Sequence, residues 1–134
     1  MEGTQLALDE EPDSVDVSLM GCFDAEVDDV VGAAAVVLAT PANFGYMSGA
    51  MKDFFERIYH PCLDRTVGRP YVLMVKGDTD TSGAIASVEK IVAGLQWKAV
   101  LPNLSVVGEI TAADLETATE LGATLTAGLA AGIF

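Results

Sequence analysis

Two short apolar runs limit the fold of this chain more than any other feature of its sequence. Residues 34–39 are Ala-Ala-Val-Val-Leu-Ala, and residues 70–75 are Pro-Tyr-Val-Leu-Met-Val. Continuous runs of small and β-branched residues are typical of strands covered on both faces, as in the interior of a parallel sheet. A glycine-bearing loop and then a helical pattern follow each run. We therefore expect an α/β domain in which right-handed crossovers join parallel strands.

Weaker patterns mark the remaining elements of the N-terminal half. Residues 14–20 alternate polar and apolar side chains, which predicts a strand, and residues 23–31 predict a short helix with Asp24 as its N-cap. A longer helix is expected over residues 50–59. It should end near Pro61, because proline lacks the amide hydrogen and disfavours helical angles in the preceding residue.

The C-terminal half continues the alternation. Residues 82–95 predict a helix and residues 100–107 a strand, in which a Pro-Asn pair should delay pairing until Leu104. Thr111, with Asp114 three residues later, has the form of a capping box and should open the last helix. The inner face of that helix is expected to comprise Leu115, Ala118, Leu121, Leu125 and Leu129.

Composition restricts the number of domains and the partners. With 134 residues, of which 51% are apolar, the chain has the size of one domain, residues 1–134. Asp and Glu number 20 against 7 Lys and Arg, so the net charge is -13. Such a charge repels polyphosphate backbones and anionic lipid surfaces, so neither nucleic acid nor membrane is an expected partner.

The sequence also favours a cytoplasmic setting. Its longest nearly uninterrupted apolar stretch, residues 30–39, is about half of the roughly 20 residues that a membrane-spanning helix needs. No charged and then apolar leader opens the chain, so no secretory signal is expected. Cys22 and Cys62 belong to no CxxC pair and form no disulfide framework, which fits a reducing compartment.

The loop after the first apolar run is the candidate functional site. Residues 40–49 are Thr-Pro-Ala-Asn-Phe-Gly-Tyr-Met-Ser-Gly, without a charge. Strand-to-helix loops line the crevice in which open parallel sheets bind ligands. Glycines there let the main chain approach a ligand, and aromatic, amide and hydroxyl groups offer flat surface and hydrogen bonds. The candidate residues are Thr40, Pro41, Ala42, Asn43, Phe44, Gly45, Tyr46, Met47 and Ser48.

This loop and the order of elements resemble the flavodoxin-like family, specifically its NAD(P)H-dependent FMN reductases and quinone oxidoreductases. The resemblance extends over about residues 3–129 and is strongest over residues 38–57. Its motifs are Thr40-Pro41, Phe44-Gly45, Met47-Ser48-Gly49, Lys52 and Phe54-Phe55. A second loop stands where the family places its other flavin-edge loop, and its candidate residues are Lys76, Gly77, Asp78, Thr79, Ser82 and Gly83.

The resemblance implies a flavodoxin-like three-layer α/β sandwich that binds FMN and uses NAD(P)H as substrate. Electrons would pass from NAD(P)H through FMN to a quinone or similar small-molecule acceptor, and no residue is assigned as a catalytic acid or base. Phe44, Tyr46 and Met47 are expected to contact the flat ring. Asn43 and Ser48 are expected to form hydrogen bonds to the flavin, although Ser48 is equally suited to cap the helix.

Two other functions remain open. One is a flavodoxin-type electron carrier, for which an acidic surface suits docking to a basic redox partner. The other is a non-catalytic, truncated flavodoxin-like domain that serves only in interactions.

The start of the chain departs from the family pattern. The family opens with a strand and a Ser/Thr-rich loop that binds the FMN phosphate, whereas residues 1–8 have the pattern of the end of a helix. About four strands are therefore expected, without the interior first strand of the family order 2-1-3-4-5. Three explanations are open: Met1 is an internal methionine of a longer protein, the remaining strands pair directly, or a second copy supplies the edge. The last two favour a homo-oligomer.

Several side chains have a purely structural interpretation. His60 precedes Pro61 at a helix end, where an imidazole interacts well with the helix dipole. Cys62 is expected to be a small buried residue, and Trp97 a core residue or a subunit contact. Lys52 and Arg57 have the spacing of a solvated helix face with nearby carboxylates. The acidic residues of the second loop lack the spacing of a calcium loop, so no metal site is expected.

Overall fold

The computed structural model describes residues 15–134, so the helix end expected within residues 1–8 lies outside the described part. Two compact units divide the chain: Met20–Gly108, and Met1–Leu19 together with Glu109–Phe134. The unit Met20–Gly108 contains the whole sheet and three of the helices.

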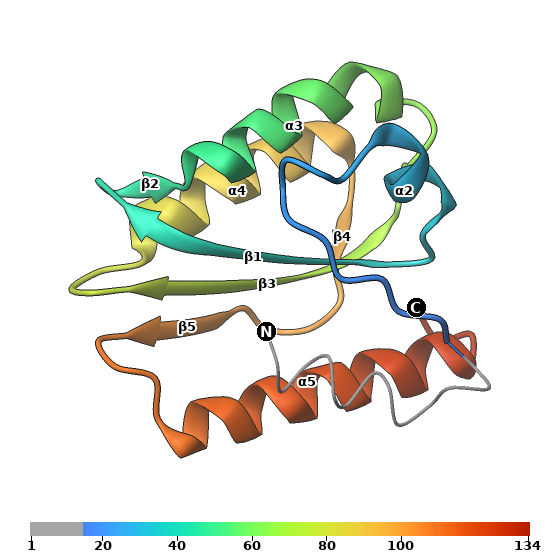
Figure 1. Cartoon of the computed structure of the whole chain (residues 1–134). Helices are drawn as coiled ribbons and strands as arrows, with labels where there is room; N and C mark the ends of the chain where they lie inside the picture. The colour runs from blue at the N-terminus through green and yellow to red at the C-terminus, as the bar shows by residue number, and fades with distance from the viewer. Residues whose placement is uncertain (1–14) are drawn as a thin grey trace. The chain divides into compact units, whose positions relative to one another are not determined.

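A mainly parallel sheet forms the centre of the unit Met20–Gly108 (Figure 1). Strand β1 (Val36–Asn43) pairs in parallel with β3 (Pro70–Gly77), and this confirms the strands expected from the two apolar runs. Strand β2 (Tyr46–Met47) is antiparallel to the end of β1. The strands β4 (Lys98–Ala99) and β5 (Leu104–Val107) both pair in parallel with β3.

On the side of β3 that faces away from β1, the sheet ends in two short strands separated by an interruption. Strand β4 pairs with the beginning of β3, where Lys98 N donates to Arg69 O at 2.8 Å. The chain then leaves the ladder at the Pro-Asn pair and rejoins it at Leu104, as predicted, because proline has no amide hydrogen to donate. The short strand β4 was not expected from the sequence.

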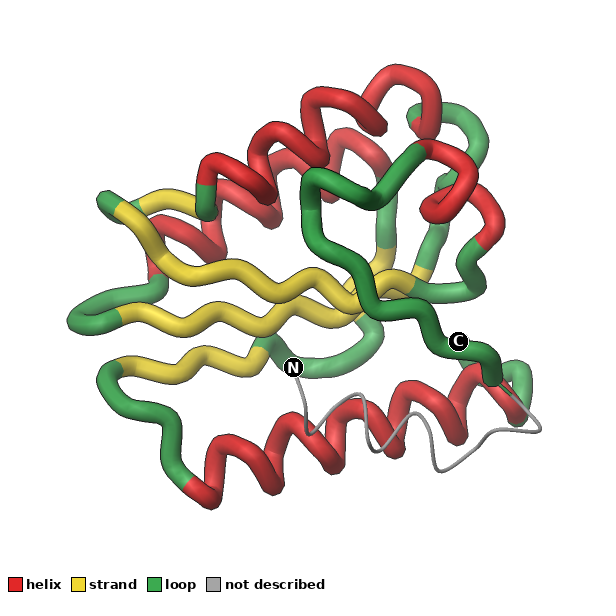
Figure 2. Tube along the Cα trace, in the orientation of Figure 1, coloured by secondary structure: helices red, strands yellow, loops and turns green. Residues whose placement is uncertain are grey.

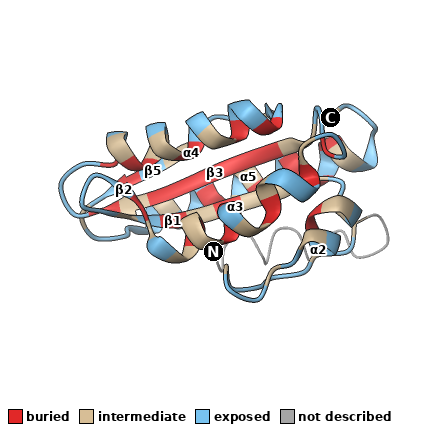
Figure 3. Cartoon of the chain, turned by 90° about the horizontal axis from the view of Figure 1, so that it is seen from above, coloured by how far each residue is buried: buried red, intermediate tan, exposed pale blue. Residues whose placement is uncertain are grey.

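Helices α2 (Val27–Gly32), α3 (Gly49–Cys62) and α4 (Ser82–Leu95) contribute to one hydrophobic core with β1 and β3. Figure 3 shows the continuous burial of β3, whose residues are mostly covered on both faces. Trp97 is a core residue, with its ring 6.4 Å from that of Phe55 and its Nε1 donating to Thr66 Oγ1 at 2.8 Å. The boundaries predicted for α4 are confirmed, whereas α3 runs on through Pro61 to Cys62.

The segment before α2 differs from the expectation. Residues 15–20 form no strand, because a strand needs a neighbouring ladder and the alternating pattern does not supply one. Asp24 is not the N-cap: it lies in a turn, with its amide donating to Gly21 O at 3.0 Å. The helix begins at Val27 after Glu26, and Asp29 completes a capping box with Glu26.

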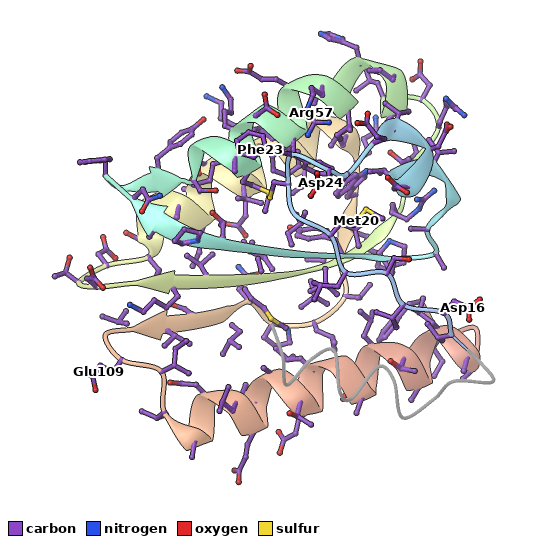
Figure 4. The ribbon with its side chains drawn as sticks, in the orientation of Figure 1. Asp16, Met20, Phe23, Asp24, Arg57 and Glu109 are labelled. Carbon is purple, nitrogen blue, oxygen red and sulfur yellow. The ribbon has the colours of Figure 1, made fainter. Side chains whose placement is uncertain are left out.

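Two arginines attach this segment to the rest of the unit. Arg57 on α3 donates to the carbonyl oxygens of Cys22 and Ala25 and forms an ion pair with Asp53 at 2.7 Å. Figure 4 shows it beside the stretch that contains Phe23 and Asp24. Arg69 donates to the carbonyl oxygens of Val30 and Val31 in the last turn of α2, where helix carbonyls run out of partners within the helix. The carboxylate partners expected for this helix face are confirmed, since Arg57 pairs with Asp53 and Lys52 with Glu56. In addition, Arg57 binds backbone carbonyls of another segment, which the sequence did not indicate.

Helix α5 (Ala112–Ala130) belongs to the other unit. The predicted capping box is confirmed, since Thr111 N donates to Asp114 Oδ2 at 2.8 Å and Asp114 N to Thr111 Oγ1 at 3.2 Å. The predicted inner face is only partly right: Ala118 and Leu125 are buried, but Leu115 is 49% exposed. Small residues are buried as well, because the Phe134 ring packs so closely on Gly128 that a Cβ there would lie 2.2 Å from it. In residues 15–134 no helix is long and apolar enough to cross a membrane.

Candidate functional site

The candidate loop is a β-hairpin. Strand β1 continues through the expected loop residues to Asn43, and β2 returns antiparallel to it, with Asn43 opposite Tyr46. The two turn residues, Phe44 and Gly45, have φ angles of 52° and 69°. Positive φ at both central residues is what a type I′ hairpin turn requires, so the segment expected to be a loop between a strand and a helix is largely a hairpin.

The base of the hairpin is held by two hydroxyl residues. Thr40 Oγ1 accepts the Ser48 amide at 2.9 Å and donates to Pro41 O at 2.9 Å. Ser48 Oγ accepts the Met51 amide at 3.1 Å, so Ser48 caps α3. Met47 is only 2% exposed and belongs to the core. These three residues therefore support the hairpin, and the Met47 side chain, for which we expected a contact with the ring, is covered by the core in this structure.

The tip of the hairpin presents its aromatic side chains to solvent. Phe44 is fully exposed at 107%, Tyr46 is 41% exposed, and Asn43, opposite Tyr46 in the ladder, is exposed too. A positive φ on a bulky residue costs about 1–3 kcal/mol and persists only where the surrounding structure imposes it. The fold thus holds Phe44 in a strained backbone conformation at the end of a parallel strand, with its aromatic ring exposed to solvent.

The second predicted loop follows β3. Lys76 Nζ and Asp78 Oδ1 form an exposed ion pair at 3.0 Å. Asp80 accepts hydrogen bonds from the Ser82 amide at 3.0 Å and the Ser82 hydroxyl at 2.7 Å, and these bonds lower the pKa of Asp80. Thr81, which the sequence did not single out, joins this loop to β5 through a 2.5 Å contact between its hydroxyl and that of Ser105.

The structure brings the two predicted loops together. A Cβ on Gly83 would lie 2.1 Å from the Gly45 carbonyl oxygen, so the hairpin turn rests on the first turn of α4. A Cβ on Gly77 would lie 3.2 Å from Ala42 Cβ. Ser87, also missed from the sequence, accepts the Met47 amide at 3.1 Å. The glycines at positions 77 and 83 are visible in the sequence. The sequence does not show, however, which distant residues they contact.

All of these residues lie at one edge of the sheet, where β1, β3 and β5 end at Asn43, Gly77 and Val107 (Figure 2). We call it the carboxyl edge. Val107 adds a further exposed apolar side chain there. A crevice outside the carboxyl ends of parallel strands is the usual ligand position in open α/β sheets.

Two other places on the unit offer less chemistry. An open groove of about 260 Å³ is lined by Lys52, Phe55, Glu56, Tyr59, His60 and Ile91. Burial raises the pKa of the Cys62 thiol and of the Cys22 thiol, which disfavours the reactive thiolate.

In residues 15–134 no group of three or more His, Cys, Asp or Glu side chains is placed to hold a metal ion.

Comparison with known proteins gives matches in structure but not in sequence. No protein-family model matches the chain, and no curated protein matches it. A flavodoxin from the domain Archaea superposes with a TM-score of 0.82 over 96% of this chain and 86% of its own, at 16% identity. A WrbA-like flavodoxin from Agrobacterium tumefaciens has a TM-score of 0.73 over 96% and 88%, at 15% identity.

A flavodoxin from Pseudomonas aeruginosa, solved as a point mutant, gives a TM-score of 0.71 at 21% identity and covers 96% of this chain and 87% of its own. At these identities the likeness concerns the fold. The chain therefore has the flavodoxin-like α/β fold that residues 38–57 led us to expect.

Proposed function

We propose that the chain binds a flavin, FMN, at the carboxyl edge between the hairpin tip and the loop after β3. The observation that supports this best is Phe44, which is fully exposed on a strained turn. A flat ring with apolar faces is the kind of ligand that an uncovered aromatic side chain stabilises by stacking. The fold of the neighbours, which are flavodoxins, supports the same ligand class.

Each element of the carboxyl edge has a defined task in this proposal. Phe44 and Tyr46 would cover a face of the ring, and the exposed amide of Asn43 would bond to its polar edge. The close contact of Gly45 with Gly83 keeps the hairpin tip against the second loop, so the two loops hold their relative position before a ligand arrives.

The described residues fit the ring of FMN and do not fit its phosphate. Anions bind best at helix N-termini that have free amides. In residues 15–134, the starts of α2, α4 and α5 already bind carboxylates of Asp29, Asp80 and Asp114. We therefore assign residues to the ring alone.

For activity, we propose an FMN-dependent oxidoreductase of flavodoxin-like type. A bound flavin supplies the redox chemistry that links NAD(P)H to a quinone or similar acceptor. The chain would orient the ring and shield one face with the hairpin aromatics. An electron carrier with an acidic docking surface and a non-catalytic interaction domain are the alternatives.

The test is titration of the purified protein with FMN, followed by quenching of flavin fluorescence. We expect saturable quenching, and we expect Phe44→Ala to raise the Kd about 2- to 12-fold, because an aromatic stacking pair contributes about 0.5–1.5 kcal/mol. Phe23→Ala is the matched control, since Phe23 is 67% exposed but stands before α2. An unchanged Kd in Phe44→Ala, or no quenching in the parent protein, would contradict the assignment.

Turnover separates the redox alternatives. Oxidation of NADPH by the flavin-loaded protein only when a quinone is present supports the reductase. Flavin binding without this oxidation favours the electron carrier. The absence of flavin binding favours the interaction domain.

A further inference from the structure

We infer that residues 15–134 recognise the isoalloxazine ring of a flavin and not its phosphate, so that riboflavin binds at least as tightly as FMN. The inference rests on the proposed flavin function and specifies its ligand class: a flavin without a terminal anion. It follows from how the chain uses its helix starts and its cations.

The start of α4, which contacts the hairpin turn, already binds a carboxylate. The Asp80 carboxylate accepts the Ser82 amide at 3.0 Å and the Ser82 hydroxyl at 2.7 Å at the beginning of α4. The Gly45 carbonyl oxygen covers the same turn, since it lies where a Gly83 Cβ would be. A phosphate would have to displace one negative and one partially negative oxygen to reach these amides.

The starts of α2 and α5 also bind carboxylates. Asp29 binds the amide of Glu26 at 2.8 Å before α2, and Asp114 binds the amide of Thr111 at 2.8 Å before α5. Helix α3 has no acid in its first turn. Even so, the Ser48 amide there donates to Thr40 at 2.9 Å, and the Ser48 hydroxyl accepts the Met51 amide at 3.1 Å.

The cations near the carboxyl edge are committed to carboxylates. All 7 Lys and Arg residues lie between Lys52 and Lys98. Lys76, at the end of β3, pairs with Asp78 at 3.0 Å, and Lys52, in the first turn of α3, pairs with Glu56 at 3.0 Å. Residues 1–51 and 99–134 contain acids but no Lys or Arg.

Charge therefore opposes the phosphate while leaving the ring unaffected. A phosphate monoester has a charge of about -1.5 to -2 at neutral pH. The protein has a net charge of -13, and Asp78 and Asp80 are exposed beside the proposed site. Riboflavin has the same ring and ribityl chain without this charge, so it gains the stacking contacts and avoids the repulsion.

The experiment compares the Kd values of riboflavin and FMN, each measured by fluorescence quenching on the full chain. At about 10 mM salt, where the Debye length is about 30 Å, we expect FMN to bind more weakly than riboflavin. At about 1 M salt, where the length is about 3 Å, we expect the FMN Kd to fall toward that of riboflavin. The riboflavin Kd should change much less, because it bears no charge to be screened.

A charge variant tests the residues. In Asp78→Asn/Asp80→Asn, we expect the ratio of the FMN Kd to the riboflavin Kd at low salt to fall toward one, whatever the change in the riboflavin Kd itself. Asparagine can still accept the Ser82 amide, so the start of α4 is preserved. Asp64→Asn is the matched control: Asp64 is exposed before β3, whose eight residues separate it from the carboxyl edge by roughly 26 Å.

The outcomes separate the two proposals. FMN binding that is tighter than riboflavin binding and is weakened by salt would overturn this inference and leave the flavin function intact. Failure of both ligands to bind would overturn the flavin function, and this inference with it. Riboflavin binding equal to or tighter than FMN binding, with salt strengthening only FMN, supports both.

Discussion

The backbone of Phe44 has a positive φ angle, which a bulky residue rarely adopts and which its surroundings therefore impose. Its sequence neighbours predict a turn, and Gly45 supplies a positive φ without strain. Phe44 has no such freedom, yet it has a φ of 52°, because the Asn43 and Tyr46 pairing leaves only two residues for the turn. From the sequence we expected Phe44 to offer an aromatic surface to a ligand. The sequence did not predict that its side chain is fully exposed or that its backbone has a positive φ.

Asp80 gives a pH-dependent prediction at the same scale. The Ser82 hydrogen bonds lower its pKa, so its carboxylate form stabilises the fold above the ordinary carboxyl pKa, and this stabilisation is lost as the pH falls. We expect Asp80→Ala to lower the Tm at neutral pH, and the difference from the parent protein to shrink on acidification. Thermal melts followed by circular dichroism at several pH values measure this.

The control for this prediction is Asp64→Ala, which removes another exposed carboxylate, located in the turn after α3. It should leave the Tm nearly unchanged at every pH. A Tm difference for Asp80→Ala that stays constant down to the lowest pH would contradict a role for the Asp80 charge.

Among the helices and strands, those with a strong local sequence pattern were predicted correctly. Helix α4, strand β3 and the restart of β5 at Leu104 agree with the expected positions, because each has a strong apolar run or period. The hairpin was not predicted, since its turn is Phe-Gly rather than the typical Asn-Gly or Asp-Gly. Residues 15–20 show the reverse error: their alternation predicts a strand that is not formed.

The junction of the hairpin and α4 is tested by Gly83→Ala. The new Cβ would meet the Gly45 carbonyl oxygen, so the hairpin must move, and overpacking of this kind costs about 1–3 kcal/mol. We expect a lower midpoint of urea unfolding and weaker flavin quenching. Alanine is otherwise the better helix former, so a loss must come from the junction.

Gly49→Ala is the matched control for this junction. Gly49 is also in the first turn of a helix, but a Cβ there would meet nothing within 4 Å. It should leave stability unchanged or raise it by about 0.4–1 kcal/mol. Equal behaviour of the two alanine variants would show that the hairpin does not rest on α4.

Two properties of the whole molecule have opposite effects on self-association: an unpaired side of strand β1 favours it, and a large net charge disfavours it. In residues 15–134, β1 pairs with β3 along one side and with β2 only at Ala42 and Asn43, so its second side has no strand partner over residues 36–41. The strand contains no charged residue to discourage pairing with another chain. The net charge of -13 repels a second copy.

We therefore expect salt-dependent self-association, which fits the expectation of a homo-oligomer. Sedimentation velocity should show a larger associated fraction as protein and salt concentrations rise. Val37→Lys should reduce association by placing a charge on β1, while Val107→Lys, at the exposed end of β5, should not. A monomer at every concentration and salt would contradict the prediction.

Most of the alternation of strands and helices and the capping of α5 could be predicted from the sequence, because these features depend on side-chain period and on contacts within a few residues. How the candidate residues divide their tasks became visible only in the folded chain. Thr40, Met47 and Ser48 support the hairpin, while Phe44 and Tyr46 face solvent. The contact of Gly45 with Gly83 joins positions far apart in the chain, and no local pattern encodes which distant backbone a glycine will meet.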